Sequence, residues 1–161
     1  MNTGSIADRE PAGGGLPLDL LAVIQELSGL HDLESVTRTV ARAARLLMGA
    51  DGASFVLREG ALVYYVDEDA IGPLWKGRRF PAEMCISGWA ILHRRHAIIP
   101  DIYADPRIPA DAYRPTFVKS LAVVPIRERD PLGAIGVYWA SAHEATPHEV
   151  ARLQALANAT A

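Results

Sequence analysis

Two runs of apolar residues in the last third of the chain constrain its fold more than any other feature. They span residues 120–126 and 134–140, and a polar turn of residues 127–133 joins them. Short runs rich in valine, isoleucine and aromatic residues are typical of strands, and a turn of this length places the strands antiparallel. Because nearly every position is apolar, both faces of this hairpin must be covered. The chain therefore has to supply layers on both sides of a sheet.

A second hairpin and a short strand complete the predicted sheet. Residues 53–57 and 62–66 are enriched in β-branched and aromatic side chains, and they flank a turn that contains Gly60. Residues 97–99 have the composition of a short strand, which Pro100 stops.

Helical periodicity marks the two segments before that hairpin. An amphipathic segment runs from Leu16 to Leu27, with Pro17 suited to a first helical position. Asp32 can cap a second helix over residues 33–47, in which apolar side chains recur at steps of three and four and give one buried face.

The middle of the chain is less regular. Residues 67–86 have little periodic signal, and we expect a loop there with a short helical turn at 71–75. Ser87 can cap a third helix that runs to Arg95. Residues 100–115 contain four prolines, three aspartates and two tyrosines, which exclude regular structure over most of the segment. Ordered loops of this length tend to serve as lids or binding elements.

The last helix has the clearest start signal. Thr146, Pro147 and Glu149 combine a cap, a proline at the first helical position and the acid of a capping box. Neither glycine nor proline follows before Ala161, so we expect this helix to be truncated here and to continue in a longer protein.

The order of elements predicts one α+β domain. Helix, helix, hairpin, helix, strand, long loop, hairpin and helix build an antiparallel sheet with flanking helices. The chain has 161 residues, about the length of one domain. Residues 1–15 hold four glycines among small and charged side chains, so we expect a flexible tail before a single domain at 16–161.

Charge and cysteine content restrict the partners and the compartment. Sixteen Lys and Arg against 19 Asp and Glu give a net charge of −3, so we expect no nucleic-acid partner and no direct membrane contact. Asp19 and Glu26 interrupt the first apolar stretch, which argues against a signal peptide or membrane span. The single cysteine, Cys85, cannot form an internal disulfide, which fits a cytoplasmic location.

Several stretches, together with the element order, resemble a bacterial GAF domain. They are residues 86–90 (ISGWA), 98–102 (IIPDI), 120–126 (SLAVVPI) and 133–139 (GAIGVYW), the last being similar to the final core strand of the family. The resemblance covers about residues 18–161.

The resemblance implies a GAF-like fold, related to PAS domains. It has an antiparallel sheet of five or six strands, a small-molecule pocket beneath the long loop on one face, and terminal helices that form a homodimer on the other. Domains of this type are similar to the N-terminal sensory domains of bacterial two-component sensor histidine kinases. Diguanylate cyclases and transcription activators are alternative effector domains in the same polypeptide. Because members bind different ligands, the cofactor or ligand stays unknown.

Eight residues are candidates for binding an unidentified small molecule. The loop at 101–117 is the expected lid, and its guanidinium groups and aromatic rings suit an anionic or planar ligand. In the alternative, the aromatic rings pin the loop to the sheet and the arginines pair with Asp105 or Asp111. The candidates are Cys85, Trp89, Asp101, Tyr103, Arg107, Tyr113, Arg114 and Phe117.

Cys85 bears on two chemistries known in the family. A position just before a helix would lower the pKa of its thiol, whereas the alternative is a small buried apolar residue. Covalent bilin carriers commonly have a histidine after the attaching cysteine, shortly before the strand equivalent to 120–126. Cys85 precedes Ile86 far upstream, which argues against a covalent bilin. The family's free methionine sulfoxide reductase uses several cysteines, and one thiol cannot close the disulfide of that cycle.

We predict no catalytic or metal site. The sequence has no Gly-rich phosphate loop, nucleophile elbow or convincing pair of carboxylates. His93 and His96 could share a helix face, but they lack a third ligand nearby. Two short basic clusters are interpreted as solvated or partner-contacting surface: Lys76, Arg78, Arg79, Arg94 and Arg95.

These observations favour a regulatory domain over an enzyme. A small molecule, or a change in redox state, would alter the pocket and shift the packing of the terminal helices. The competing hypothesis is a ligand-free dimerisation or scaffold module, whose helices alone carry the interface.

Overall fold

Six antiparallel strands form the sheet that organises residues 19–161, the part of the chain described by the computed structural model. The strand order is β3-β2-β1-β6-β5-β4, so the two predicted hairpins meet at the sheet centre through β1 and β6. The strands are β1 (Gly52–Glu59), β2 (Leu62–Ala70), β3 (Arg79–Pro81), β4 (Ala97–Ile99), β5 (Ser120–Ile126) and β6 (Gly133–Trp139). The expected α+β sheet of five or six strands is confirmed.

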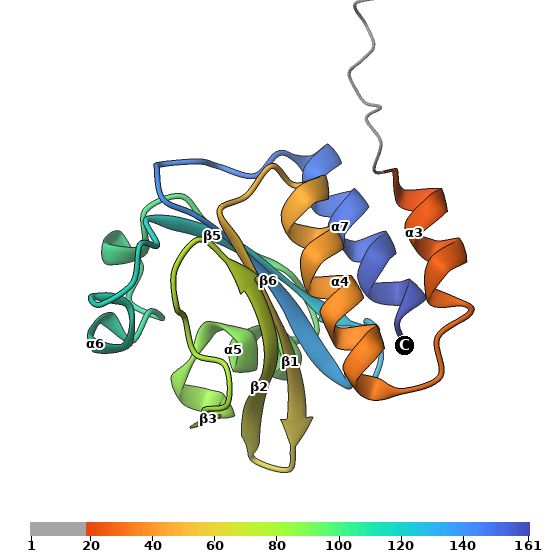
Figure 1. Ribbon diagram of the computed structural model, residues 1–161. Helices are drawn as coiled ribbons and strands as arrows, with labels where there is room; N and C mark the ends of the chain where they lie inside the picture. The colour runs from red at the N-terminus through yellow and green to blue at the C-terminus, as the bar shows by residue number, and fades with distance from the viewer. Residues whose placement is uncertain (1–18) are drawn as a thin grey trace, which may run out of the picture.

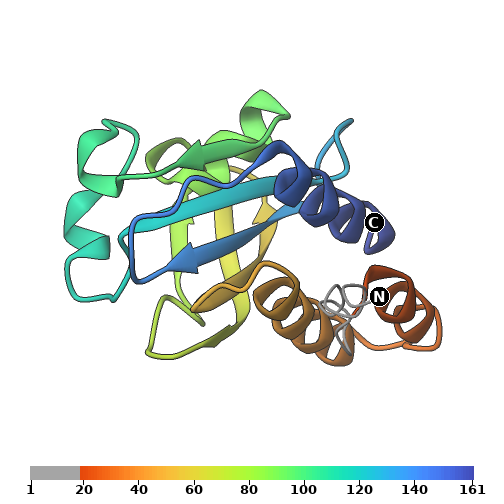
Figure 2. The ribbon, with the colours of Figure 1, turned by 90° about the horizontal axis from the view of Figure 1, so that it is seen from above.

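Three helices cover one face of the sheet (Figure 1). They are α3 (Leu20–Leu27), α4 (Leu33–Leu47) and α7 (Pro147–Ala159). Helix α4 packs on β1 and β2, α7 packs on β5 and β6, and α3 contacts both helices. Seen from above, α4 and α7 lie next to the sheet and α3 lies farther out (Figure 2). The terminal helices of the described chain therefore share one layer.

Shorter elements cover the opposite face (Figure 1). A 3-10 turn, η1 (Ala82–Met84), leads directly into helix α5 (Ile86–His93). The predicted lid contains a second 3-10 turn, η2 (Ile102–Ala104), and a helix of one turn, α6 (Ala110–Tyr113). Regular structure is thus short within this loop, as its prolines predict.

Strand β6 lies between two hydrophobic cores, which explains its apolar sequence. Ile135, Val137 and Trp139 face the helix layer, whereas Ala134 and Tyr138 face α5 and the lid. Alternate side chains of a strand point to opposite faces, so a strand between two cores needs apolar residues throughout.

Pro125 lies within β5, where proline would usually cost a ladder hydrogen bond. Strand β4 pairs only with residues 121–123 of β5, so no strand lies beside Pro125 on that edge. Its carbonyl instead accepts a hydrogen bond from Gln154 Nε2 of α7, at 2.8 Å. The shortness of β4 therefore leaves this end of β5 available for contact with α7.

The start of α7 confirms the predicted capping box. Glu149 N–H donates to Thr146 Oγ1 at 3.1 Å, and Thr146 N–H donates to Glu149 Oε1 at 2.8 Å. Two backbone donors that a helix start leaves without partners are satisfied in this way.

Replacing Thr146 by alanine is expected to lower the free energy of unfolding by about 1 kcal/mol, because the cap of α7 is lost. Urea denaturation measures this. Thr160→Ala is the matched control, because the Thr160 hydroxyl bonds only to the Ala157 carbonyl at the other end of α7. That variant should change the stability by less than about 0.5 kcal/mol. Equal losses in both variants would show that the cap has no special role.

Two predicted helix starts differ from the structure. Helix α3 begins at Leu20 with Asp19 as its cap, and Pro17 and the predicted tail at 1–15 lie outside the described residues. The cap of α5 is Cys85, because Ser87 lies inside the helix and accepts a hydrogen bond from the Tyr65 hydroxyl instead.

The helical turn predicted at residues 71–75 is wrong. This segment is an irregular loop, and strand β3 follows it at the sheet edge. The Ile71 N–H donates to the Asp51 carbonyl, and the N–H groups of Leu74 and Trp75 donate to the Glu68 carboxylate, so these groups need no helical hydrogen bonds.

Candidate functional site

A cluster of aromatic rings occupies the space between the lid and the sheet. Its centre is the buried Trp75, which makes edge-to-face contacts with three tyrosines. The ring centroids lie 5.5 Å from Tyr65, 4.7 Å from Tyr113 and 5.4 Å from Tyr138. The tyrosines come from β2, the end of α6 and β6, so one indole joins the sheet to the lid.

Hydrogen bonds fix both the side chain and the backbone of Trp75. Its indole N–H donates to the Ala112 carbonyl in the lid at 3.0 Å. The carboxylate of Glu68 on β2 accepts hydrogen bonds from the backbone N–H groups of Leu74, Trp75 and Lys76, at 2.9–3.0 Å. These bonds anchor the loop and direct the indole inward.

The cluster contains polar atoms as well as rings. The Tyr138 and Ser54 hydroxyls are 2.7 Å apart, and the Tyr65 hydroxyl donates to Ser87 Oγ at 3.2 Å. Tyr113 is buried, but its hydroxyl forms no hydrogen bond with any of residues 19–161. A buried hydroxyl without a partner is unfavourable, so this group is the one most ready to bind a ligand or a water molecule.

Burial keeps these phenols neutral. It raises the pKa of Tyr65, Tyr113 and Tyr138 above the usual range. Neighbouring tyrosines add to the effect at Tyr65 and Tyr113, whereas Cys85 and Glu68 add to it at Tyr138. Each hydroxyl therefore remains protonated and able to donate a hydrogen bond. The site suits an uncharged ligand group that accepts hydrogen bonds.

Very little space remains between these side chains. A cavity of about 10 Å³ lies among the rings, enough for about one water molecule. Its lining includes Cys85 and Tyr113 from the predicted ligand set and Tyr65, Trp75, Phe80, Pro109 and Ala112 from outside it. The predicted small-molecule pocket is thus closed by the protein's own side chains.

The pKa of Cys85 differs from the sequence-based expectation. The Gly88 N–H points at Sγ from 3.4 Å, as expected at the start of a helix. Burial nevertheless raises the pKa of the thiol, because desolvation of the thiolate outweighs the hydrogen bonds that favour it. With 6% of its surface exposed, Cys85 occupies the position of a small apolar residue in the cluster.

The thiol of Cys85 is expected to react with a disulfide reagent at least about tenfold more slowly in the native protein than in urea at the same pH, because it is buried and protonated. Absorbance of the released thiolate follows the reaction. Free cysteine in each buffer corrects for the reagent itself. Equal rates in the folded and unfolded protein would show an accessible, reactive thiol and would favour redox sensing.

Two arginines of the lid are already paired. Arg107 makes a two-pronged contact with Asp105, at 3.0 Å from Nε and 2.7 Å from the terminal nitrogen. These hydrogen bonds lower the pKa of Asp105. Arg114 pairs with Asp111 on the exposed side of α6. This is the alternative pairing that the sequence allows. Neither arginine lines the cavity in the aromatic cluster.

The remaining predicted residues are dispersed. The carboxylate of Asp101 accepts a hydrogen bond from the Tyr103 N–H and caps η2, and the Tyr103 side chain is 51% exposed. Phe117 packs on the core between the sheet and the lid, where its ring lies against Gly52. Trp89 lies on the outer side of α5, half-buried, with His93 stacked on it. The eight candidates therefore do not form one site.

Sequence reasoning missed the residues that build the cluster, namely Trp75, Tyr65, Tyr138 and Glu68. A tryptophan within a polar, aperiodic segment was the available signal, because such a side chain must be buried against something distant. Tyr65 and Tyr138 lie on predicted strands, but their common face could not be assigned without the sheet order.

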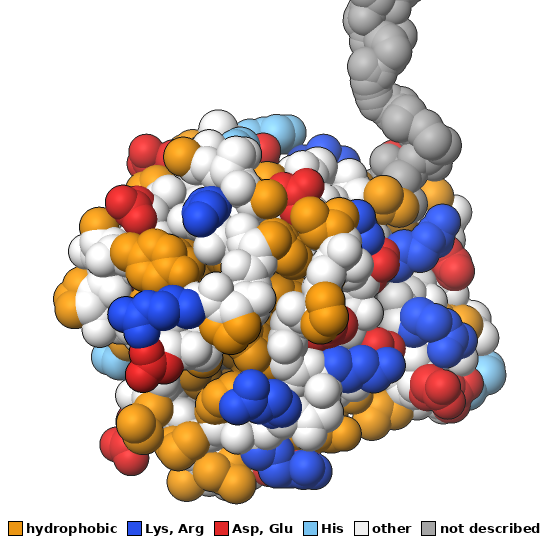
Figure 3. All heavy atoms as spheres, turned by 60° about the vertical axis from the view of Figure 1, so that its left-hand side comes forward, with side chains coloured by type: hydrophobic (Ala, Val, Ile, Leu, Met, Phe, Trp, Pro, Cys, Tyr) orange, Lys and Arg blue, Asp and Glu red, His pale blue; other side chains and the backbone are white. Residues whose placement is uncertain are grey.

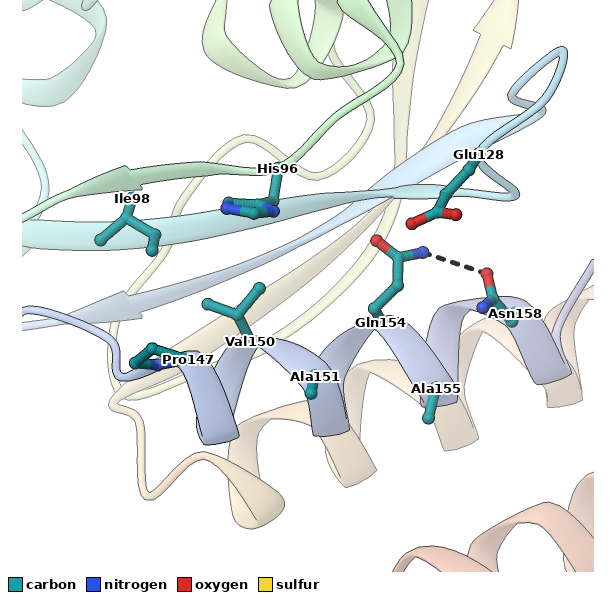
Figure 4. Close-up of a pocket in the computed structure, with 9 residues that line it drawn as sticks. All are labelled: His96, Ile98, Glu128, Pro147, Val150, Ala151, Gln154, Ala155 and Asn158. Atoms are coloured by element: carbon teal, nitrogen blue, oxygen red, sulfur yellow. Dashed lines mark hydrogen bonds between the residues drawn. The ribbon is translucent and has the colours of Figure 1, made fainter.

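A separate open groove lies on the helix side of the sheet (Figure 4). It occupies about 640 Å³ between α7 and the short strand β4. Val150, Ala151 and Ala155 of α7 form one wall, and His96 and Ile98 form the other. This surface belongs to the layer that contains the terminal helices.

Within 19–161, no three His, Cys, Asp or Glu side chains come together in a way that could hold a metal ion. None of the helices in this range combines the length and the apolar character that a membrane crossing requires. On the lid face, positive and negative side chains alternate with apolar ones, without a field of one sign (Figure 3).

Comparison with solved structures identifies the fold. The GAF domain of an Acinetobacter phosphoenolpyruvate-protein phosphotransferase is similar with a TM-score of 0.76 and 14% identity, over 88% of this chain and 87% of that one. The GAF-B domain of DevS from Mycobacterium smegmatis gives a TM-score of 0.66 and 20% identity, over 80% and 90% of the two chains.

An enzyme is also similar in fold. Free methionine-R-sulfoxide reductase from Neisseria meningitidis, solved with its substrate, has a TM-score of 0.75 and 17% identity over 88% of this chain and 83% of that chain. No curated protein matches the sequence.

A family model described as GAF domain matches residues 32–161, most of the chain. That match agrees with the six-stranded sheet, the two flanking layers and the structural similarities above. GAF domains are regulatory and sensory domains found in signalling proteins. This chain belongs to the GAF domain family.

Proposed function

We propose that this GAF domain is the cytoplasmic input module of a bacterial signal-transduction protein, and that a small molecule bound beneath the lid regulates a downstream effector domain. A two-component sensor histidine kinase is the first candidate for that effector, and a diguanylate cyclase or transcription activator is the alternative. The proposed role is regulatory, not catalytic. The observation that carries it is the buried aromatic cluster, in which the Tyr113 hydroxyl has no hydrogen-bond partner among residues 19–161.

The sheet supplies a route from the cluster to the terminal helices. On β6, Tyr138 faces the cluster, while its neighbours Val137 and Trp139 pack in the core beneath α4 and α7. Displacing Trp75 would remove its indole from the Tyr138 ring, and β6 would lose a packing contact on this face. A ligand needs only a few kcal/mol of differential affinity to shift two helix arrangements.

A ligand can bind beneath the lid only if the cavity enlarges. The present cavity holds about 10 Å³, so either the Trp75 loop or the lid must move before a metabolite fits. The ligand class that suits the site is small, largely apolar and uncharged, with an acceptor for a tyrosine hydroxyl. A redox signal is less well supported, because burial raises the pKa of Cys85.

The closed cavity also favours a second candidate function. A ligand-free dimerisation or scaffold module would need no space beneath the lid, and its terminal helices alone would carry the interface. The two functions make different predictions for ligand binding, because a ligand that binds only the native state raises the melting temperature.

A thermal-shift panel of cyclic nucleotides, haem, bilins and amino acids tests the sensing function. Ala112→Phe is the matched variant, because Ala112 lines the cavity and a larger side chain fills it. We expect a compound that raises the melting temperature of the wild type but not of Ala112→Phe, whose own transition shows that it folds. Silence across the panel would support the scaffold, and equal shifts in both proteins would place binding elsewhere.

The homodimer is proposed to form through the terminal helices. Leu21 on α3 is 65% exposed, which leaves a large apolar side chain on the outer face of the helix layer. Leu21→Asn is expected to weaken self-association at least about tenfold in sedimentation equilibrium. Met84→Asn is the control, because Met84 is 64% exposed on η1, on the opposite face of the sheet. A strictly monomeric wild type would contradict the dimer.

A further inference from the structure

A second site, separate from the aromatic cluster, lies on the outer surface where α5, β4 and the lid meet. This cleft has a volume of about 360 Å³ and is lined by Trp89, Arg95, His96, Ala97, Ile98 and Arg107. We refer to it as the Trp89 cleft. It shares no lining residue with the cavity beneath the lid.

Two guanidinium groups converge on the indole of the Trp89 cleft. Cζ of Arg107 lies 4.4 Å from the ring centroid, and Cζ of Arg95 lies 5.4 Å from it. The His93 ring stacks on the same indole at 4.5 Å. Cation–π contact orients both guanidiniums, so their hydrogen-bond donors are positioned in advance.

The positive charge of the cleft is only partly neutralised. Asp105 pairs with Arg107. Arg95 forms no ion pair with any of residues 19–161, and His96 beside it likewise has none within that range. Bringing two guanidiniums to one ring with a single carboxylate leaves a net positive site, which an oxyanion would balance.

The floor of the cleft is apolar. The half-buried Ile98 of β4 provides it, since Ala97 is only 3% exposed, and His96 and Ile98 also line the groove beside α7. The cleft therefore opens toward further apolar surface. A ligand that fits combines an anionic head with an apolar body.

We propose that the Trp89 cleft binds a small organic anion whose carboxylate or phosphate group is held by Arg95 and Arg107, while its apolar part lies on Ile98. The site goes beyond the proposed sensing function, since it is distinct from the aromatic cluster. A bound anion would link α5 and β4 to the lid through Arg107.

The test titrates the protein with phenyl phosphate, benzoate and the neutral benzyl alcohol at constant ionic strength. Indole N–H signals in a nitrogen-15 spectrum provide the readout, and the chain has three tryptophans. Trp89 alone lines the cleft, and the buried Trp75 and Trp139 serve as internal controls. Trp89→Phe assigns the signal.

We expect one or both anions to shift the Trp89 signal saturably, with little effect from benzyl alcohol. A response to phenyl phosphate alone indicates phosphate monoesters, a response to benzoate alone indicates carboxylates, and a response to both indicates a general anion site. Arg95→Gln should weaken binding at least about tenfold. Arg129→Gln, in the exposed β5–β6 turn, should leave it unchanged.

Three results would overturn the proposal. They are no saturable shift of the Trp89 signal up to about 10 mM anion, an equal shift with benzyl alcohol, and unchanged affinity in Arg95→Gln. None of these results bears on ligand binding beneath the lid, which Ala112→Phe tests separately.

Discussion

Replacing Trp75 by alanine is expected to lower the free energy of unfolding by about 3–5 kcal/mol, the usual range for truncating a large buried ring. The indole is 2% exposed and contacts three tyrosine rings. Its loss also leaves the Ala112 carbonyl without its donor. Urea denaturation measures the loss. Trp89→Ala is the matched control, with a smaller expected effect because Trp89 is only half-buried.

The same variant should gain a binding property. Removing the indole leaves a cavity of apolar walls and free hydrogen-bonding groups, and cavities of this kind bind small aromatic molecules. Indole should therefore raise the melting temperature of Trp75→Ala but not that of the wild type. A stability loss below about 1 kcal/mol would show that Trp75 is loosely packed, and the closed description of the site would then be wrong.

Replacing Gly88 by alanine is expected to cost about 3 kcal/mol, at the upper end of the range for overpacking. A Cβ at this position would lie 1.8 Å from the Ala82 carbonyl oxygen, so α5 would have to move away from η1. Alanine otherwise favours a helix over glycine by about 1 kcal/mol. Helix propensity alone thus predicts a gain, and the sign of the change separates the two effects.

Gly29→Ala is the control for this glycine. A Cβ there would lie 3.6 Å from the nearest atom, an ordinary contact. Its stability should change by less than about 0.5 kcal/mol. If Gly88→Ala were as stable as the wild type, α5 would not be seated tightly on η1, and Cys85 and Ser87 would not be fixed beneath the lid.

The elements that could be predicted from the sequence are those with signals in their own residues. Helices α4 and α7 follow from their caps and from apolar spacing, and β5 and β6 follow from apolar runs that only a two-layered core can bury. The long loop follows from its prolines. In each case, the information lies within the segment itself.

The closed state of the site could not be predicted in the same way. Trp75 is placed by Glu68 on β2 and by rings from β2, α6 and β6, so its position depends on the assembled sheet. Strand β3 is three residues long and has no periodicity of its own. Arg107 pairs with Asp105 and does not line the cavity beneath the lid, and the sequence allowed either arrangement.

Hydrogen exchange, followed by mass spectrometry, tests whether a small molecule bound beneath the lid changes the terminal helices. The compound that stabilises the wild type most strongly in the panel is compared with buffer. We expect altered exchange in two places at once: the segment around Trp75 and Tyr113, and the amides of α3 and α7 on the opposite face of the sheet. A change confined to the lid side, with unchanged terminal helices, would contradict a sensory role for this domain.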